Sequence, residues 1–419
     1  MKKIILFFLV LLMLVSCSQM ENELSIPQNE TRRDGKISQE QARENLIKVR
    51  GNFYPETRGK EPVISSCVSY GKSMTPTTRS GEEPIIYVFN YEDNQGFAIM
   101  SATPALPEVL AISEKGNLDL QNLPDNGVKA FVSRIGEFVE DPDTMAVGDG
   151  IPYTVNFPWQ TTIKTEPLCK VKWDQGSPYN KYTPMVSGHK SYVGCGGVAV
   201  AQAMSIYHKP ASFQGYNFNW DAMTQSHPSD DAMDQIARFM EVIGRPGIGD
   251  FYYLENGTGA DLPQLVNVLH QCGYEEATDT LVKLPTEKNP RQIFYYEADV
   301  RNELELLRPV IVLGSTENND IGGNRHIWLL HGFMEMQRKV QQRVNTINGY
   351  DILSERTETE EYVLCNWGWS GMYDGYYLNG IFDMTGDEYI LEEPNPNAGS
   401  GPFDFAYKLK IIKHIYPTK

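Results

Sequence analysis

Three short stretches of this chain carry residues that could perform nucleophilic chemistry together. The first, Gly194-Cys195-Gly196-Gly197, precedes small and apolar residues that predict a helix ending near Pro210. A cysteine in the first turn of a helix lies among unpaired backbone N–H groups at the positive end of the helix dipole. Both features favour the thiolate, the nucleophilic form of cysteine. Cys195 is therefore a candidate nucleophile, although the pattern also fits a small buried residue in a tightly packed helix.

The second stretch, "NRHIWLLHGF", holds His326 and His331. A thiolate nucleophile needs a histidine to pair with it and to protonate the leaving amine. His208 lies at the far end of the same predicted helix, about 20 Å from the thiol, and cannot serve. We predict a strand over Arg325 to Leu330, on which side chains alternate between faces, so only one of the two histidines can face a given site. The alternative is that both are ordinary half-buried histidines.

The third stretch, "VLCNWGWSGMYDGYY", supplies Asn366 with Trp367 and Trp369 close by. The order cysteine, histidine, asparagine is that of papain-like proteases. In those enzymes the asparagine orients the histidine, and a neighbouring tryptophan shields their hydrogen bond from water. The glycines around Cys195 would let a substrate backbone come close and leave the Cys195 N–H free as an oxyanion donor.

Composition limits the classes of partner. The chain has 419 residues and a net charge of −17, which argues against a nucleic-acid partner and against adhesion to anionic lipid. At 41% hydrophobic residues it can bury more than one core, so two domains are expected. The six cysteines are widely spaced and include no CxxC pair, so a zinc ribbon is unsupported.

The beginning of the sequence predicts export. "MKKIILFFLVLLMLVSCSQ" has two lysines and then an apolar run that is too short for a membrane-spanning helix, which is the layout of a secretory signal. Its end, Leu14 to Cys17, resembles a bacterial lipobox. We therefore predict a signal peptide at 1–16, a lipid-modified Cys17 and a flexible tether at 17–35, which would make the protein a cell-envelope lipoprotein at the outer membrane or cell surface. The alternative is ordinary signal cleavage nearby. With Cys17 lipidated, five cysteines remain in an oxidising compartment, so at least one is a free thiol.

Two folded domains follow the tether. Ser38 with Gln41 predicts a capped first helix, and 71–83 reads as a loop. Three β-rich runs and a helical stripe then predict an antiparallel meander covered by a helix, in a small α+β domain at 36–142. The β-rich runs are 85–91, 96–101 and 109–112, and the stripe is 128–139. A segment rich in Asp, Pro and Gly marks a linker and processing region at 143–165, and the second domain spans about 150–419.

Several blocks, in order, resemble streptopain and its relatives, which are exported papain-like cysteine peptidases of bacteria made as zymogens. The blocks are "QGSPYN", "GCGGVAVAQAMSIYHKP", "GTGADLPQLVNVLHQCGY", "RPVIVLGS", "GGNRHIWLLHGF" and "NWGWSGMYDGYY". The upstream "YVFNYEDNQGFAIMSATPALPEVLAIS" resembles the pro-domain of that family. The resemblance implies an α+β fold in which a two-lobed papain-like catalytic domain, half helical and half antiparallel sheet, follows a small α+β pro-domain that inhibits it.

Catalytic roles follow from the resemblance position by position. Cys195 aligns with the family nucleophile and His326 with the family histidine, while Asn366 and Trp367 share the task of orienting that histidine. Gln175 is the candidate for the second oxyanion donor, with a simple turn residue as the alternative. His331 falls where relatives usually carry an aspartate.

Other positions either depart from the family or are suggested as parts of the substrate site. Asn324 and Arg325 stand where the family often has a glycine directly before its histidine, which would alter access to the site. A wall of the substrate pocket is expected from Tyr252, Tyr253, Gly257, Gly259 and Ala260. An insertion at 334–360, longer than expected for the family, predicts a charged β-hairpin with a type I′ turn at Asn348-Gly349. It is expected to project near the cleft, or else to be a solvated decoration.

Together these features predict an exported, lipid-anchored endopeptidase zymogen that hydrolyses peptide bonds through a Cys/His pair and an acyl-enzyme intermediate. Its partners would be protein or peptide substrates, its own pro-domain as intramolecular inhibitor and the membrane, with no metal or organic cofactor. Two alternatives remain open. One is a papain-like amidase or transpeptidase acting on cell-wall peptides, and the other is a catalytically inactive lipoprotein that binds peptides.

Overall fold

The structure is a computed structural model. It describes residues 36–123, 127–138, 153–254, 257–279, 295–315, 325–346, 349–382 and 409–418. The predicted signal peptide, the tether with Cys17 and the first part of the predicted linker lie outside the described residues. Within those ranges no helix is long and apolar enough to cross a membrane.

The N-terminal part is a four-stranded antiparallel sheet with two principal helices. Helix α1 (Gln39–Phe53) begins with the expected capping box, in which the Gln41 backbone N–H donates to the Ser38 hydroxyl and the Ser38 N–H to the Gln41 side chain. The predicted meander and stripe are present as three strands and a helix, and β1 precedes them. These elements are β1 (Ile64–Tyr70), β2 (Ile86–Tyr91), β3 (Phe97–Ser101), β4 (Val109–Ser113) and α3 (Gly127–Phe138). The segment read as a loop contains the short helix α2 (Thr77–Ser80). Two 3-10 turns, η1 (Pro55–Thr57) and η2 (Glu92–Asn94), complete this part.

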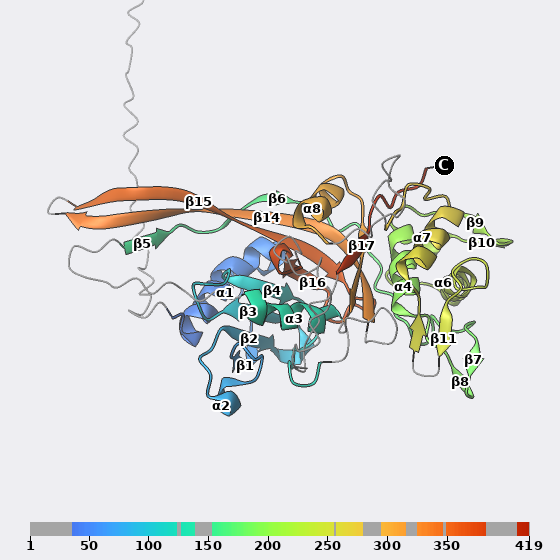
Figure 1. Ribbon diagram of the computed structural model, residues 1–419, viewed down its shortest axis with the longest axis horizontal. Coiled ribbons are helices and arrows are strands. Elements are labelled where there is room, and N and C mark those ends of the chain that lie inside the picture. The colour runs from blue at the N-terminus through green and yellow to red at the C-terminus, as the bar shows by residue number, and fades with distance from the viewer. Residues whose placement is uncertain are drawn as a thin grey trace, which may run out of the picture. The chain divides into compact units, whose positions relative to one another are not determined.

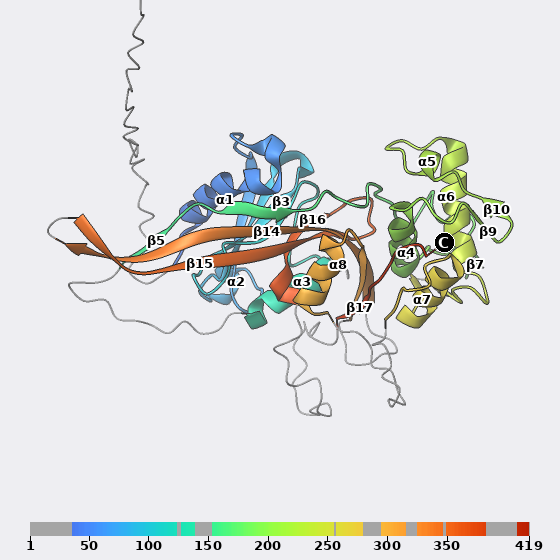
Figure 2. The same ribbon diagram turned by 90° about the horizontal axis from the view of Figure 1, so that it is seen from above.

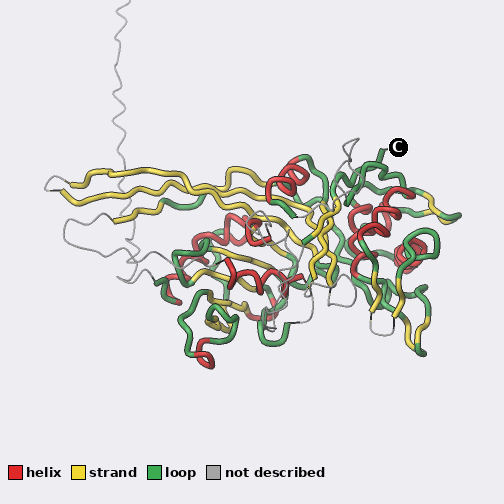
Figure 3. Tube along the Cα trace, viewed as in Figure 1, coloured by secondary structure: helices red, strands yellow, loops and turns green. Residues whose placement is uncertain are grey.

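The C-terminal part divides into a helical half and a sheet half (Figure 3). The helical half contains α4 (Cys195–Ser205), α5 (Trp220–Met223), α6 (Asp230–Ile243) and α7 (Leu262–Gln271). Its three small hairpins are β7 (Met185–Val186) with β8 (His189–Lys190), β9 (Ser212–Phe213) with β10 (Tyr216–Asn217), and β11 (Tyr252–Leu254) with β12 (Gly257–Gly259). The sheet half contains α8 (Glu297–Glu305), β13 (Val310–Ser315), β14 (Arg325–Thr346), β15 (Gly349–Asn366), β16 (Gly375–Leu378), η3 (Asn379–Phe382) and β17 (Lys410–Ile412).

One antiparallel sheet joins the N-terminal part to the sheet half (Figure 1). Its strand order is β1-β2-β3-β4-β16-β15-β14-β13-β17, and the junction is the pairing of β4 with β16, with Ile112 opposite Tyr376. Side chains that alternate along β14 enter two different cores. Ile327 and Leu329 pack with the helical half, whereas Trp328 and Leu330 pack with the N-terminal part and α8.

The predicted insertion forms a long hairpin arm of β14 and β15, paired from Leu329 with Asn366 to Thr346 with Gly349. Two strands of the predicted linker, β5 (Tyr153–Asn156) and β6 (Gln160–Lys164), pair with the outer edge of β14. Figures 1 and 2 both show the far end of the arm remote from α4, so the expected position near the cleft is wrong.

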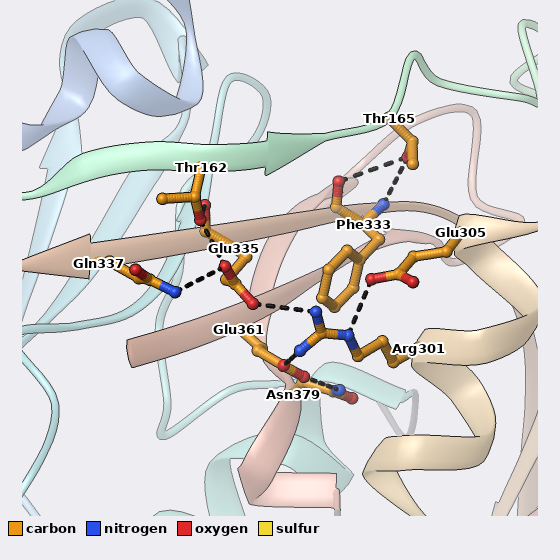
Figure 4. Close-up of polar contacts among 9 residues, drawn as sticks. All are labelled: Thr162, Thr165, Arg301, Glu305, Phe333, Glu335, Gln337, Glu361 and Asn379. Carbon is orange, nitrogen blue, oxygen red and sulfur yellow. Dashed lines mark hydrogen bonds and ion pairs between the residues drawn. The ribbon is translucent and has the colours of Figure 1, made fainter. Parts of the chain in front are cut away.

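A buried ionic cluster fixes the base of this arm (Figure 4). Arg301 of α8 forms ion pairs with Glu335 of β14 and Glu361 of β15. The Thr162 hydroxyl of β6 donates to the Glu335 carboxylate at 2.5 Å, and the Asn379 amide donates to Glu361 at 3.5 Å. The linker strand is therefore tied by a side chain, as well as by its backbone, to the arm.

Candidate active site

Cys195 is the first residue of α4, as the glycine pattern predicts. Gly194 precedes it with a φ of 91°, in the left-handed region that favours glycine. A Cβ at Gly194 would also lie 2.7 Å from the Thr258 carbonyl oxygen of β12, which leaves no room for a side chain. Gly196 lets α4 approach β14, because a Cβ there would lie 3.2 Å from Cδ1 of Ile327. The glycines thus place the thiol between the β12 loop and the start of β14.

Opposing effects act on the pKa of the Cys195 thiol. Burial raises it, and the backbone N–H groups of Ile327, Gly196 and Cys195 itself lower it, with a further lowering from the Arg325 guanidinium. Burial prevails, so the pKa is raised overall. For Cys67 and Cys272 burial is the one effect that acts, and it raises each pKa to about 12. Cys195 therefore has donors suited to a thiolate, but in this arrangement it is not activated.

His326 is enclosed by tryptophans. Its Nε2 donates to the backbone carbonyl of Trp367 at 3.0 Å. Its ring stacks on Trp328 at a centroid distance of 6.3 Å and meets Trp369 edge-on at 6.1 Å. Burial lowers the pKa of His326 to about 4 against the raising effect of the Trp367 carbonyl, so the ring is neutral at pH 7.

The thiol and the imidazole lie on opposite sides of β14. Ile327 contacts α4 at Gly196, whereas the neighbouring His326 stacks on Trp328, and successive strand side chains point to opposite faces. Among the residues that the structure describes, no hydrogen bond joins the Cys195 thiol to His326. The structure therefore brings the strand of His326 to Cys195, the candidate nucleophile, without pairing the two side chains.

The two candidate orienting residues behave differently. The Asn366 side chain does not contact His326. Its amide donates to the Val171 carbonyl at 3.0 Å, and its Oδ1 accepts from the Gln202 side chain at 3.1 Å and from the Gly368 N–H at 3.0 Å. Trp367 contacts the histidine through its backbone carbonyl, and its ring is fully buried. In this arrangement the segment orients His326 through the main chain.

Gln175 and the candidate substrate residues lie beside the thiol segment. The Gln175 carbonyl accepts from the Val193 N–H at 2.9 Å, which places it close to Cys195 in the fold. Its side chain is half-buried and makes no hydrogen bond to any residue that the structure describes. Tyr252 pairs with Gly259 across the β11–β12 hairpin, and Tyr252 is 54% exposed. The expected pocket wall is therefore next to Gly194, because Thr258 of the same hairpin packs there.

His331 has a structural environment. It is buried, and its Nδ1 accepts from the Cys169 backbone N–H at 3.2 Å. Burial lowers its pKa to about 3, with a smaller contribution from Lys172. A neutral imidazole thus satisfies a buried N–H group where relatives usually carry an aspartate.

Residues of the N-terminal part cover the tryptophans around His326. A Cβ at Gly127, the first residue of α3, would lie 1.9 Å from the ring of Trp367. Phe131 of α3 meets Tyr377 edge-on at 5.0 Å, and Tyr377 meets Trp367 at 5.1 Å. The segment after Trp369 is held as well, because the Lys115 ammonium donates to the Ser370 carbonyl at 2.6 Å. No pattern in the sequence singles out Gly127, because a glycine at the start of a helix has many explanations.

Comparison with known proteins identifies both parts. Residues 173–377 match the Peptidase C10 family, and residues 36–138 match the Spi protease inhibitor family. The segment at 173–377 belongs to the peptidase C10 family. It is 22% identical over 386 residues to the thiol protease/hemagglutinin PrtT of Porphyromonas gingivalis, covering 88% of this chain but 41% of that protein. It is 20% identical to streptopain of Streptococcus pyogenes, covering 70% of this chain and 73% of streptopain.

The fold is also that of a solved structure. Prointerpain A of Prevotella intermedia, solved as a fragment, superimposes with a TM-score of 0.50 at 19% identity, covering 80% of this chain and 96% of that chain. The expected α+β architecture, a papain-like domain preceded by a pro-domain, is thereby confirmed. The residues that cover the His326 side of β14 lie within the inhibitor-like segment at 36–138.

Proposed function

We propose that this member of the peptidase C10 family is an exported cysteine endopeptidase made as a zymogen. The observation that carries the proposal is the position of Cys195 at the first turn of α4, beside its own N–H and those of Gly196 and Ile327. These donors favour a thiolate and can bind negative charge that develops on a substrate carbonyl. The inhibitor-like segment that contacts Trp367 supports the zymogen form.

In the active form, the Cys195 thiolate attacks the scissile carbonyl carbon and forms a tetrahedral intermediate. The Cys195 N–H and the Gln175 side chain hold its oxyanion. His326, having taken the thiol proton, gives it to the leaving amine as the C–N bond breaks. Water, deprotonated by His326, then attacks the thioester and releases the carboxylic acid and the thiol. Trp367 and Asn366 keep the imidazole in place during both steps.

Latency follows from the position of His326. While the pro-domain covers the tryptophans, the ring remains neutral and on the far side of β14 from the thiol. Cleavage within the 143–165 segment would release the pro-domain and let the ring turn toward Cys195. The pro-domain therefore inhibits by withholding the general base as well as by covering the enzyme.

The purified full-length chain tests this function. We expect it to convert to a shorter form and then to degrade an unfolded protein, and expect a thiol alkylator to stop both. Cys195→Ala should remain full-length and inactive, while His331→Asn should mature because His331 lies outside the site. In a parallel reaction, cell-wall peptide replaces the unfolded protein as the substrate offered. Cleavage of cell-wall peptide alone, or maturation of the Cys195→Ala protein in a purified system, would contradict the proposal.

Anchoring is a separate part of the proposal. The lipobox-like Leu14 to Cys17 after an apolar run supports a lipid on Cys17. Expressed in a bacterium with labelled fatty acid, the chain should incorporate label and enter the detergent phase on phase separation. Cys17→Ser should do neither. Labelling that persists in the Cys17→Ser variant would rule out lipidation at this residue.

A further inference from the structure

Arg325, directly before His326, is on the same side of β14 as the nucleophile. The pairing of β13 with β14 is regular from Ser315 opposite Arg325 to Val310 opposite Leu330, so alternation is uninterrupted there. Arg325 and Ile327 therefore share a face, and Ile327 contacts α4 at Gly196. His326 points away from the side of β14 on which the thiol lies. The neighbouring Arg325 side chain therefore points toward that side.

An ion pair holds the guanidinium in this position. Its Nη1 lies 2.6 Å from Oδ1 of Asp261, and the Arg325 side chain is 25% exposed. Asp261 directly precedes α7 and follows Gly259 and Ala260 of the candidate substrate loop, whose Thr258 packs on Gly194. Arg325 is therefore tied, through Asp261, to the end of the candidate substrate loop that packs beside Cys195.

Arg325 has donors to spare. Arginine offers five N–H groups in a planar fork that matches a carboxylate. Among the residues that the structure describes, Asp261 is the one hydrogen-bond and ion-pair partner of Arg325. The remaining N–H groups can bind a second carboxylate without breaking the first pair. The Arg325 charge also reaches the thiol, since it lowers the pKa of Cys195.

We infer that Arg325 is a specificity-determining residue that favours substrates with an acidic side chain at one of the positions flanking the scissile bond. This inference rests on the proposed peptidase function. Asp261 is the positioning residue that fixes the guanidinium. An apolar or aromatic substrate side chain would lie against the exposed Tyr252, and the acidic one would pair with Arg325. The substrate class is thus an extended peptide of mixed apolar and acidic character.

The test uses the matured enzyme and pairs of peptides that differ only by Glu or Gln at one position, for each position flanking the scissile bond. Glutamine keeps the shape of glutamate and removes its charge. We expect kcat/KM to favour Glu by about 5- to 10-fold at one position, as for a partly exposed charge-assisted hydrogen bond. The preference should fall as salt is raised.

Two variants assign the preference to Arg325. Arg325→Gln should bring the Glu-to-Gln ratio to about 1, and Arg325→Lys should keep part of it because the charge remains but the fork is lost. A Glu-to-Gln ratio of kcat/KM near 1 in the natural enzyme overturns the inference. A ratio that stays at the natural value in both Arg325→Gln and Arg325→Lys also overturns it. Absence of cleavage of every peptide by an enzyme with an alkylatable Cys195 would instead overturn the proposed function.

Discussion

The two faces of β14 near residue 326 differ in what they present and in what covers them. On one face Ile327 packs against α4, and Cys195 is the first residue of that helix. On the other face His326 and Trp328 pack together, and the inhibitor-like segment covers Trp367 beside them. The proposed nucleophile on α4 and the proposed general base on β14 thus lie on opposite sides of the strand.

On the proposed mechanism a short movement separates the latent and active forms. The strand register and Arg325 need not move, because only the His326 ring must turn. The contacts that would oppose this turn lie on the far face and include the Trp367 carbonyl and the α3 cover of Trp367. Substitutions of the proposed catalytic groups and substitutions of the residues that cover them should therefore have effects of opposite sign on activity.

The largest expected difference is between the two histidines of β14. His326→Ala in the matured enzyme should lower kcat/KM by about 10²- to 10⁴-fold, because the thiol loses its general base and the leaving amine its acid. His331→Asn should retain activity within a few-fold, since an amide oxygen can accept from the Cys169 N–H as the imidazole does. Peptide hydrolysis and thermal unfolding of both proteins provide the check. Equal losses of activity would contradict the assignment.

The second expected effect concerns the cover on the far face. Gly127→Leu introduces a side chain where even a Cβ would lie 1.9 Å from the Trp367 ring, so α3 cannot dock as it does now. Overpacking of this kind costs about 3 kcal/mol, which corresponds to roughly 100-fold faster appearance of the mature form if docking limits activation. The measurement is the rate of conversion of the full-length chain on gels.

Gly136→Leu is the matched comparison for Gly127→Leu. It lies on the same helix, but a Cβ there would meet the Lys72 carbonyl oxygen at 2.5 Å, inside the pro-domain itself. It should lower the melting temperature of the pro-domain more than Gly127→Leu does. If both variants convert at rates that follow only their melting temperatures, the Trp367 contact is not the element that maintains latency.

The sequence predicted the local features well, and the structure explains what it could not predict. The capping box at Ser38, the helix that begins at Cys195 and the strand through His326 depend on neighbouring residues, so their patterns are readable. Strand β1 was missed because most of its residues are only partly buried or exposed and polar.

Long-range features were not readable in the same way. The pairing of β4 with β16 joins segments far apart in the sequence, and no local pattern announces it. The hairpin arm was predicted, but not the linker strands β5 and β6 that pair with it. The alternation of side chains along a strand predicted that His326 and His331 face opposite sides. It could not predict on which side the thiol lies, because that depends on how α4 packs against β14. Asn366 looks like a histidine partner in sequence, whereas its hydrogen bonds go to Gln202, Val171 and Gly368.

The third expected effect depends on pH and concerns Asp374, on the covered face. Burial raises the pKa of Asp374 to about 7, against the lowering effects of the Trp367 N–H, Lys172 and Lys115. Because the folded pKa lies above the unfolded value near 4, the stability that it contributes is full below about pH 4 and is lost as pH rises through 7. Asp374→Asn keeps an oxygen for the Trp367 N–H and cannot ionise.

We therefore expect Asp374→Asn to unfold like the natural chain near pH 4 and to be more stable by about 4 kcal/mol at pH 8, because three pKa units correspond to about that free energy. Urea unfolding at both pH values, in the Cys195→Ala background to prevent self-cleavage, measures the difference. An advantage that is equal at the two pH values, or larger at pH 4, would show that ionisation of Asp374 is not the cause.

The smallest expected effect concerns the linker strand β6, which pairs with β14 at the base of the arm. Thr162→Val removes the hydroxyl that donates to Glu335, while Gln337 and Arg301 still bind that carboxylate (Figure 4). The loss should be about 1 kcal/mol, as for one hydrogen bond to a group that keeps other partners. In the Cys195→Ala background, an added protease should then cut the 153–165 segment about fivefold faster than in the natural sequence.

Thr161→Val is the control, because it makes the same change one residue away on β6, where no side-chain hydrogen bond to a described residue is lost. Equal cutting of the two variants would mean that backbone pairing with β14 alone holds the linker, and that the ionic cluster serves the arm and α8.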